Sequence, residues 1–418
     1  MGENVHGLVD HLFRHESGRM VAALVRSLGP GQMDLAEEVV QDALLQALRK
    51  WPFSGVPEKP GAWLYRVARN LALDRLRRSA NFRGKGDDVR RSMAAVTVPE
   101  ETALPGELTD DQLRLVFLCC HPEVPRDSRV ALTLKTVGGF SVDEIARGFL
   151  ARKTTIAQRL VRAQRRIRER RLPFEVPPPD ELPERLDTVL EVLYLMFNEG
   201  YAAHDGDVLV RSDLCDEARR LVGELARLPL TRRPEVHALA ALLAFQASRF
   251  AARVDDNGEL VLLDEQDRNL WDRAAVAEGF QQLGESAAGT RRTTYHVEAA
   301  IAACHASAPN SAATDWGAIL RFYDQLLRIN PSPVVRLNRA VAVSRLHGPE
   351  VGLEALADLD GGALMDYHLF HATRGELLRR AGESQAAAAA YARALECSCS
   401  GPERRFLAHR LAMVQEPS

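Results

Sequence analysis

The chain has no long hydrophobic run, few aromatic residues and few cysteines. Because no apolar stretch reaches about 18 residues, we expect no membrane-spanning helix. Residues 1–16 carry charges and histidines where a signal peptide needs an apolar core. The six cysteines are too scattered for a disulfide framework. These absences favour a cytoplasmic protein, and 418 residues should form two or three domains.

Motifs of catalysis and metal binding are also missing. The sequence contains no nucleophile elbow, phosphate-binding loop or HExxH motif. Cys119, Cys120 and His121 are adjacent, so they cannot easily converge on one tetrahedral ion, and Cys397 and Cys399 are similarly isolated. The acid-rich stretch 255–267 lacks the regular ligand spacing and trailing glutamate of a calcium loop. We therefore expect no enzymatic activity, no cofactor and no metal site.

Charge is unevenly distributed along the chain. Residues 1–176 hold 29 of the 54 Lys and Arg and 22 of the 57 Asp and Glu, a net charge of +7. The remaining residues hold 25 basic and 35 acidic residues, a net charge of −10, so the overall value of −3 conceals the division. Such asymmetry indicates a polyanion-binding N-terminal part and a C-terminal part with another role.

Two segments divide the chain into helical blocks. Residues 79–109 lack sustained periodicity and contain Gly and Pro, which is typical of a flexible linker. Residues 173–183 contain five prolines, which favour a stiff extended spacer. Helical patterns dominate elsewhere, so the sequence predicts an all-α protein. Its predicted parts are a helical domain over 5–79, a linker over 80–108, a second helical domain over 109–172, a spacer over 173–183 and a helical extension over 184–418.

The stretch 140–171 predicts a short helix, a tight corner and a longer, very basic helix. Ser141 and Glu144 form a capping box that begins the first helix at Val142. A basic second helix after a corner is the layout that places a recognition helix in the DNA major groove. The alternative is a solvated basic helix. The second helix should bury four residues at helical spacing: Ile156, Leu160, Ala163 and Ile167.

The first domain contains two further amphipathic helices. The helix predicted over 34–51 has one broad apolar face, and acids crowd its start, where they suit the helix dipole. The helix over 62–78 carries Trp63 and Tyr65 at its entrance and several arginines along its length. Aromatic rings beside arginines suit unstacked bases. The alternative is that Trp63 and Tyr65 pack the helix onto its neighbour.

Three motifs in this order resemble the extracytoplasmic-function (ECF) class of bacterial RNA polymerase sigma factors. DLAEEVVQDALLQALRKW (34–51) is similar to the family's polymerase-clamp-binding region. PGAWLYRVARNLALDRLRR (60–78) is similar to its −10 region. DEIARGFLARKTTIAQRLVRAQRRIR (143–168) is similar to its −35-reading helix-turn-helix. The domains over 5–79 and 109–172 are thereby identified as sigma region 2 and sigma region 4.

The remaining residues resemble one group of this class, which has a long C-terminal helical extension ending in tetratricopeptide (TPR)-like hairpins. The segments that carry the resemblance are 113–124, 192–201, 213–221, 259–273 and 331–343. In the expected TPR-like part, at about 315–415, Gly375 stands at position 8 of a 34-residue unit. Ala387, Tyr391 and Ala394 then fall at positions 20, 24 and 27, which call for small, aromatic and small residues. We expect one or two recognisable repeats.

The resemblance implies an alternative sigma factor that directs core RNA polymerase to promoters and performs no catalysis. Region 2 would bind the clamp helices of the polymerase and capture flipped bases of the −10 element. The residues expected to bind polymerase are Asp34, Glu37, Glu38, Gln41 and Asp42, all predicted to be exposed. Those expected to bind the −10 element are Trp63, Tyr65, Arg66, Arg69, Asn70, Arg75 and Arg77.

Region 4 would read the −35 element as duplex while it contacts the polymerase flap. Gln158 suits adenine, and Arg159 suits guanine or phosphate. Arginines further along the helix should bind phosphates and fix register. The residues expected at this interface are Arg152, Lys153, Thr154, Thr155, Gln158, Arg159, Arg162, Arg165 and Arg166.

The acidic extension is expected to modulate activity, either by docking onto the chain's own DNA-binding domains or by binding polymerase or another protein. Two alternatives remain. The chain could be a one-component helix-turn-helix transcription factor whose helical domain senses a ligand or a protein, in which case it would bind promoters without polymerase. It could also be a helical scaffold with an incidental basic helix, which would bind neither.

Overall fold

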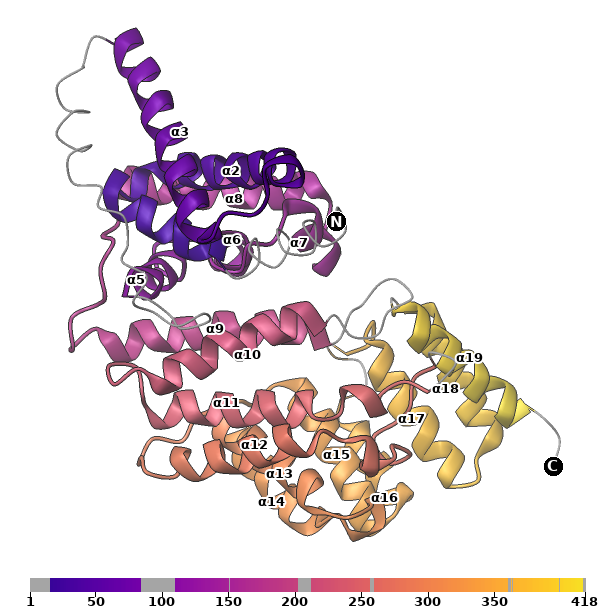
Figure 1. The fold of residues 1–418 in the computed structure, drawn as a ribbon. Helices are drawn as coiled ribbons and strands as arrows, with labels where there is room; N and C mark the ends of the chain where they lie inside the picture. The colour runs from indigo at the N-terminus through magenta and orange to yellow at the C-terminus, as the bar shows by residue number, and fades with distance from the viewer. Residues whose placement is uncertain are drawn as a thin grey trace. The chain divides into compact units, whose positions relative to one another are not determined.

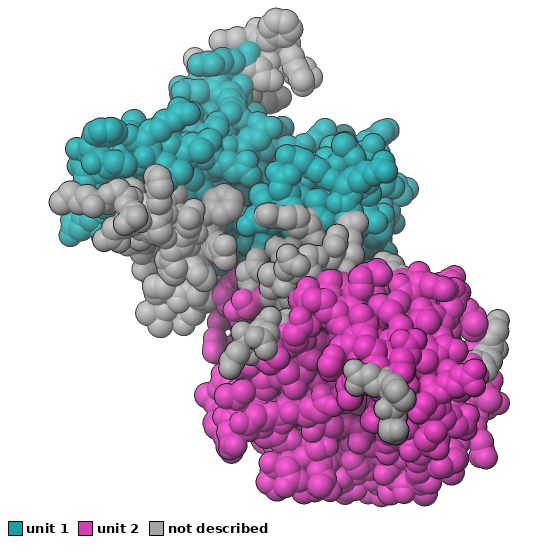
Figure 2. Space-filling model, turned by 90° about the vertical axis from the view of Figure 1, so that its right-hand side faces the viewer, with its two compact units in different colours: residues 1–196 teal, residues 197–418 magenta. Residues whose placement is uncertain are grey.

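The computed structural model describes residues 16–83, 110–149, 151–201, 212–255, 259–359, 362, 364–397 and 399–415. These residues are almost entirely helical, and their extended structure is limited to one antiparallel bridge between Val254 and Leu260. No helix among them is long and apolar enough to cross a membrane. The chain divides into two compact units, residues 1–196 and 197–418, which Figure 2 colours separately.

The first part of unit 1 that the structure describes contains three helices and one 3₁₀ turn, which we call the first module. Its largest core side chain, Trp51, is fully buried, and Gly55 ends the second helix with a φ of 78°, a conformation that glycine tolerates best. The predicted linker lies outside the described residues except at its start, where α3 continues past the predicted helix end at Arg78. The elements are a helix over residues 16–28, η1 (Pro30–Gln32), α2 (Met33–Ser54) and α3 (Pro60–Arg83).

Four further helices of unit 1 form the second module (Figure 1). The predicted capping box is present: the Ser141 amide donates to Glu144 Oε2 at 2.8 Å, and the Glu144 amide donates to Ser141 Oγ at 3.1 Å. The four apolar residues predicted to face inward on the basic helix are all buried. The helices are α5 (Asp110–Cys119), α6 (Arg126–Thr136), α7 (Val142–Gly148) and α8 (Lys153–Arg170).

Helix α9 (Leu182–Tyr201) begins in unit 1 and ends in unit 2. In unit 2, α11 is apolar on nearly every side and almost wholly buried, as expected of a helix enclosed by its neighbours. It packs against the helices that precede and follow it. Gly279 allows this packing, because a Cβ there would lie 2.6 Å from the Phe245 ring. The helices of this part are α10 (Ser212–Arg227), α11 (Pro234–Ala247), α12 (Arg273–Ser286) and α13 (Thr294–Ser307).

The rest of unit 2 consists of successive helices that pack against one another. Gly375 of α17 lies against the ring of Tyr391 in α18, and a Cβ at Gly375 would approach that ring to 2.9 Å. Ala387 and Ala394 are fully buried beside Tyr391. The elements are α14 (Trp316–Ile329), α15 (Pro333–His347), α16 (Pro349–Ala357), α17 (His368–Arg380), α18 (Ser384–Glu396) and α19 (Gly401–Gln415), with short 3₁₀ turns η2 (Phe250–Ala252), η3 (Arg268–Leu270) and η4 (Ser311–Ala313) earlier in the unit.

Candidate nucleic-acid and protein interfaces

Helix α8 presents a long polar face to solvent. Its apolar side packs into the second module, so the residues on the opposite side point outward. Val161 lies in the middle of this outward side and is 63% exposed, although it is apolar. Val161 is not among the residues predicted from the sequence to contact the −35 element, although the helical spacing places it opposite the buried residues of α8. Most of the predicted −35 residues are exposed (Arg152, Lys153, Thr154, Gln158, Arg162 and Arg165), and the others (Thr155, Arg159 and Arg166) are partly exposed.

Several cations of α8 already have acidic partners. Lys153 Nζ lies 2.8 Å from Asp143, and Arg159 Nε lies 3.5 Å from Asp127. Arg165 Nε lies 2.6 Å from Glu169, one turn further along the helix. Ion pairs this exposed are weak, so a phosphate group can displace the acid.

In α3, three of the predicted −10 residues share one exposed face. Arg66, Asn70 and Arg77 are all exposed, and their spacing of four and seven residues brings them to the same side of the helix. Arg69 is partly buried. Arg75 points elsewhere, because its guanidinium lies 2.5 Å from both Glu38 and Asp42 of α2. The structure therefore brings together only part of the predicted set.

The two aromatic residues of α3 serve as packing groups. Trp63 is partly buried and meets Trp51 edge to face, with ring centroids 5.5 Å apart. Tyr65 is only 4% exposed, and burial raises the pKa of its hydroxyl. For both residues, the geometry agrees with the alternative that they pack the helix onto its neighbours.

The expectation that all the acids of α2 are exposed is wrong for Glu37. This carboxylate is 7% exposed because the second module covers it. It accepts hydrogen bonds from Thr136 Oγ1 at 2.5 Å and from Gln164 Nε2 at 3.4 Å, and Lys135 Nζ lies 3.4 Å away. Burial raises the pKa of Glu37, although Lys135 opposes the shift.

The other acids and amides of α2 differ in their surroundings. Asp34 is partly exposed and lies 2.7 Å from Arg168 of α8. Burial raises the pKa of Asp34, and the charge of Arg168 opposes that shift. Glu38 and Gln41 are exposed, and Asp42 is partly exposed beside Arg75.

Two exposed apolar residues on one side of α2, Leu45 and Phe53, are a second feature that was not predicted from the sequence. Leu45 is 49% exposed and Phe53 is 92% exposed, and Gln41, Leu45, Arg49 and Phe53 follow one another at intervals of four. Side chains at this spacing lie on one side of a helix. Two large apolar side chains exposed on the same side of a helix make this side a candidate protein-binding surface. The signal in the sequence is their position outside the broad apolar face.

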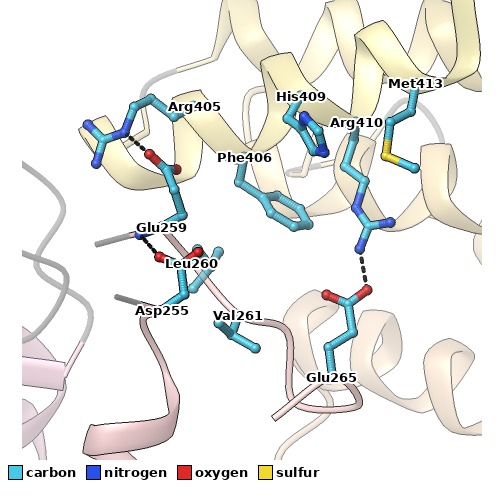
Figure 3. A pocket seen from close by; sticks show the side chains of 10 residues that line it. All are labelled: Asp255, Glu259, Leu260, Val261, Glu265, Arg405, Phe406, His409, Arg410 and Met413. Carbon is cyan, nitrogen blue, oxygen red and sulfur yellow. Dashed lines mark hydrogen bonds and ion pairs between the residues drawn. The ribbon is translucent and has the colours of Figure 1, made fainter. Parts of the chain in front are cut away.

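Unit 2 contains a cavity of about 680 Å³ between Asp255 and residues 259–265 on one side and α19 on the other (Figure 3). Two ion pairs join its walls: Glu259 to Arg405 at 2.7 Å and Glu265 to Arg410 at 2.5 Å. Phe406 lines it between the two pairs. The cavity thus combines charged and apolar walls.

Two cysteines at the C-terminal end of α5, Cys119 and the following Cys120, lie in the core of the second module. Cys119 and Cys120 are both buried, and burial raises the pKa of each thiol, to about 11 for Cys120. Neutral thiols in this setting act as small apolar residues. Within the described ranges, no three His, Cys, Asp or Glu side chains are grouped closely enough to hold a metal ion.

Two family models match the chain. The model described as Sigma-70 region 2 matches residues 12–82, which cover the first module except for its last residue, Arg83. A family of unknown function, DUF6596, matches residues 185–287, which include α10, α11 and α12.

Several known proteins are similar to the chain. An uncharacterized protein of Rhizobium meliloti (strain 1021) is 40% identical over 392 residues, which is 92% of each chain. The ECF RNA polymerase sigma factor SigL of Mycobacterium tuberculosis is 32% identical over 139 residues, covering 33% of this chain and 75% of the relative. The ECF RNA polymerase sigma-E factor of Haemophilus influenzae is 30% identical over 146 residues, again 33% and 75%. No solved structure matches the chain.

Proposed function

Because the chain belongs to the ECF RNA polymerase sigma factor family, we propose that it binds core RNA polymerase and selects promoters through their −35 and −10 elements. The observation that carries this proposal is the presence of two helices, α3 and α8, that each bury an apolar side and expose a basic one. The two helices lie in separate modules of one chain, as the reading of two separate elements requires.

The second module reads the −35 element as a helix-turn-helix, with α8 in the major groove. The side chains near its start, including Thr154 and Gln158, are exposed and contact base edges. Val161 adds an apolar contact of the kind that recognises a thymine methyl group. Arg162, Arg165 and Arg166 bind phosphates and fix the register of the helix.

The first module opens and holds the −10 element. Its exposed contacts are Arg66, Asn70 and Arg77 on one face of α3, and Trp63 lies at the entrance of that helix. Tyr65, Arg69 and Arg75 support the helix from inside the module, and Arg75 fixes α3 to α2 through its two carboxylate partners.

Polymerase binds the exposed side of α2. Glu38, Gln41 and Asp42 supply the polar contacts, and Leu45 and Phe53 supply the apolar contacts that exclude water. Asp34 is partly exposed and contributes at the edge of this surface, whereas Glu37 is covered by the second module.

The C-terminal extension modulates the activity of the two modules. Helices α17 and α18 form a TPR-like hairpin, a proposal supported by the packing of Gly375 on Tyr391 and by the buried Ala387 and Ala394. Helical-repeat surfaces of this kind bind other proteins.

Run-off transcription with purified core polymerase tests the function. The chain should direct transcripts from its own promoters only when core polymerase is present, and footprints over −35 and −10 should require the complex. Specific promoter binding without polymerase would instead favour a one-component transcription factor. Failure to bind either polymerase or promoter would refute both functions.

A further inference from the structure

The cavity of unit 2 is lined by one continuous side of α19 (Figure 3). Arg405, His409 and Met413 follow one another at intervals of four, and Phe406 lies beside them, so these side chains reach the cavity from the same side of the helix. Met413 is 48% exposed although it is apolar. The cavity volume of about 680 Å³ falls within the range of about 300–1,000 Å³ that is typical of small-molecule sites.

A buried ion pair fixes the inner part of this cavity. The Arg410 side chain is only 11% exposed, and it lies 2.5 Å from Glu265. Its guanidinium carbon lies 5.0 Å from the centroid of the Phe406 ring, a distance at which a cation attracts an aromatic face. A buried arginine that loses its carboxylate is strongly destabilising. The Arg410 pair should therefore persist when a ligand enters, and it holds the Phe406 ring in place.

The wall that faces α19, residues 259–265, is held by contacts that do not involve this helix. Asp264 forms an ion pair with Arg345 of α15. Leu260 takes part in the antiparallel bridge of unit 2. These contacts keep the wall in place whether or not Glu259 is paired.

The outer part of the cavity carries a weaker ion pair. Glu259 and Arg405 lie 2.7 Å apart, but their side chains are 39% and 43% exposed. A pair this exposed contributes little stability, and Glu259 regains water when it is displaced. An incoming carboxylate can therefore replace Glu259 at Arg405, whereas replacement of Glu265 at the buried Arg410 is costly.

We propose that this cavity binds a small carboxylate that carries an apolar body. The carboxylate of the ligand replaces Glu259 at Arg405, and the apolar body lies over Phe406 towards Met413, against Leu260 of the facing wall. Arg405 and Met413 are eight residues apart, or about 12 Å along the helix axis, which suits an aryl or short alkyl body. The site lies wholly within unit 2, so its existence does not depend on the proposed binding of polymerase and promoter.

A bound ligand connects two parts of the extension that are far apart in the sequence. Residues 259–265 lie within the part matched by DUF6596, whereas α19 lies beyond it. Because a ligand that binds only the folded state stabilises the segments that form its site, backbone hydrogen exchange should slow in residues 259–265 and in α19. Helix α11 lies outside the cavity lining and should exchange at the same rate with and without the ligand.

Isothermal titration of the full-length chain with hydrocinnamate tests the site. This probe joins a phenyl ring to a carboxylate through two methylenes, so it offers one group to Phe406 and the other to Arg405. Binding should saturate with a Kd of about 1 mM or tighter, which is the range expected for a ligand of this size. Hydrocinnamyl alcohol has the same body without the charge, and it should bind at least about tenfold more weakly. This comparison uses the unchanged chain, so it does not depend on the folding of any variant.

Three variants separate the contributions to binding. Arg405→Ala removes the partner of the carboxylate and should weaken binding of hydrocinnamate by about tenfold or more. Glu259→Gln removes the competing carboxylate and should tighten binding by about threefold. The matched control is Arg404→Ala: Arg404 is an exposed arginine on the same helix that lies outside the cavity lining and donates to the Leu395 carbonyl oxygen at 3.1 Å. Its replacement should leave the Kd unchanged.

Three results would overturn the proposal. Absence of saturable binding by both the wild type and Glu259→Gln would show that this class of ligand does not bind. Equal affinity for the acid and the alcohol would show that no carboxylate is recognised. An equal loss in Arg404→Ala and Arg405→Ala would show a general attraction to the basic helix. The run-off assay tests the sigma function separately, so none of these results bears on it.

Discussion

Replacing three arginines on α8 with alanine should change how promoter binding depends on salt. Arg162 and Arg165 are exposed and Arg166 is partly exposed, and none of them is needed for the buried side of the helix. Each phosphate contact that is lost lowers the slope of log affinity against log salt by about 0.9. Three contacts therefore account for a slope change of about 2.7.

This change in slope is large enough to measure. When KCl is raised from about 50 to 200 mM, the promoter affinity of the wild type should fall by a factor roughly 40 times larger than that of the variant. Arg165 counts toward the three although it pairs with Glu169 at 2.6 Å, because both side chains are exposed and such a pair contributes little stability. The assay is a titration of the reconstituted complex of chain and core polymerase on a labelled promoter fragment at several KCl concentrations.

The control must carry the same change in net charge without touching DNA. Arg273, Arg328 and Arg336 are exposed arginines of unit 2, and their triple substitution by alanine should leave the slope unchanged. The reasoning is refuted if the folded α8 variant changes the slope by less than about 0.9, the value expected for a single phosphate contact. This side of α8 would then not lie on phosphates.

Three other predictions concern single side chains. Burial would raise the pKa of Glu403, but hydrogen bonds from Ser400 and the His368 imidazole nitrogen 3.2 Å away outweigh it and hold that pKa at about 2. The stabilising contribution of Glu403 is therefore present above pH 4.5 and is lost as the pH falls toward 2. In thermal melts, Glu403→Gln should lower Tm at neutral pH and reduce this acid-dependent loss. Gly375→Ala should cost about 1–3 kcal/mol in denaturant unfolding because the new Cβ meets a buried ring, whereas Gly284→Ala, with open space around it, should cost nothing. If Val161 contacts a thymine methyl, uracil in the −35 element should weaken binding by the wild type and leave Val161→Ala unaffected.

Local sequence signals were sufficient for the helices of the second module. The capping box at Ser141 and Glu144 depends on residues three apart, so the start of α7 could be read without knowledge of the rest of the fold. The buried side of α8 follows from a spacing of three and four residues, which any helix imposes. Both features were predicted because the residues that determine them are neighbours in the sequence.

Burial by distant residues could not be predicted in the same way. Glu37 stands among the acids at the start of a helix, a pattern typical of an exposed first turn. Its enclosure depends on Thr136, 99 residues further along the chain, and on Gln164, 127 residues further along. The burial of Tyr65 likewise reflects tertiary packing and cannot be read from the arginines beside it. An amphipathic pattern tells which side of a helix is apolar but does not identify the partner that covers a polar side chain.

Helix α2 therefore presents two surfaces with different availability. Leu45 and Phe53 are exposed while the two modules are in contact, so the polymerase contact proposed for them needs no prior rearrangement. Glu37 becomes available only after Lys135 and Thr136 are withdrawn, and an exposed carboxylate without them regains water in compensation.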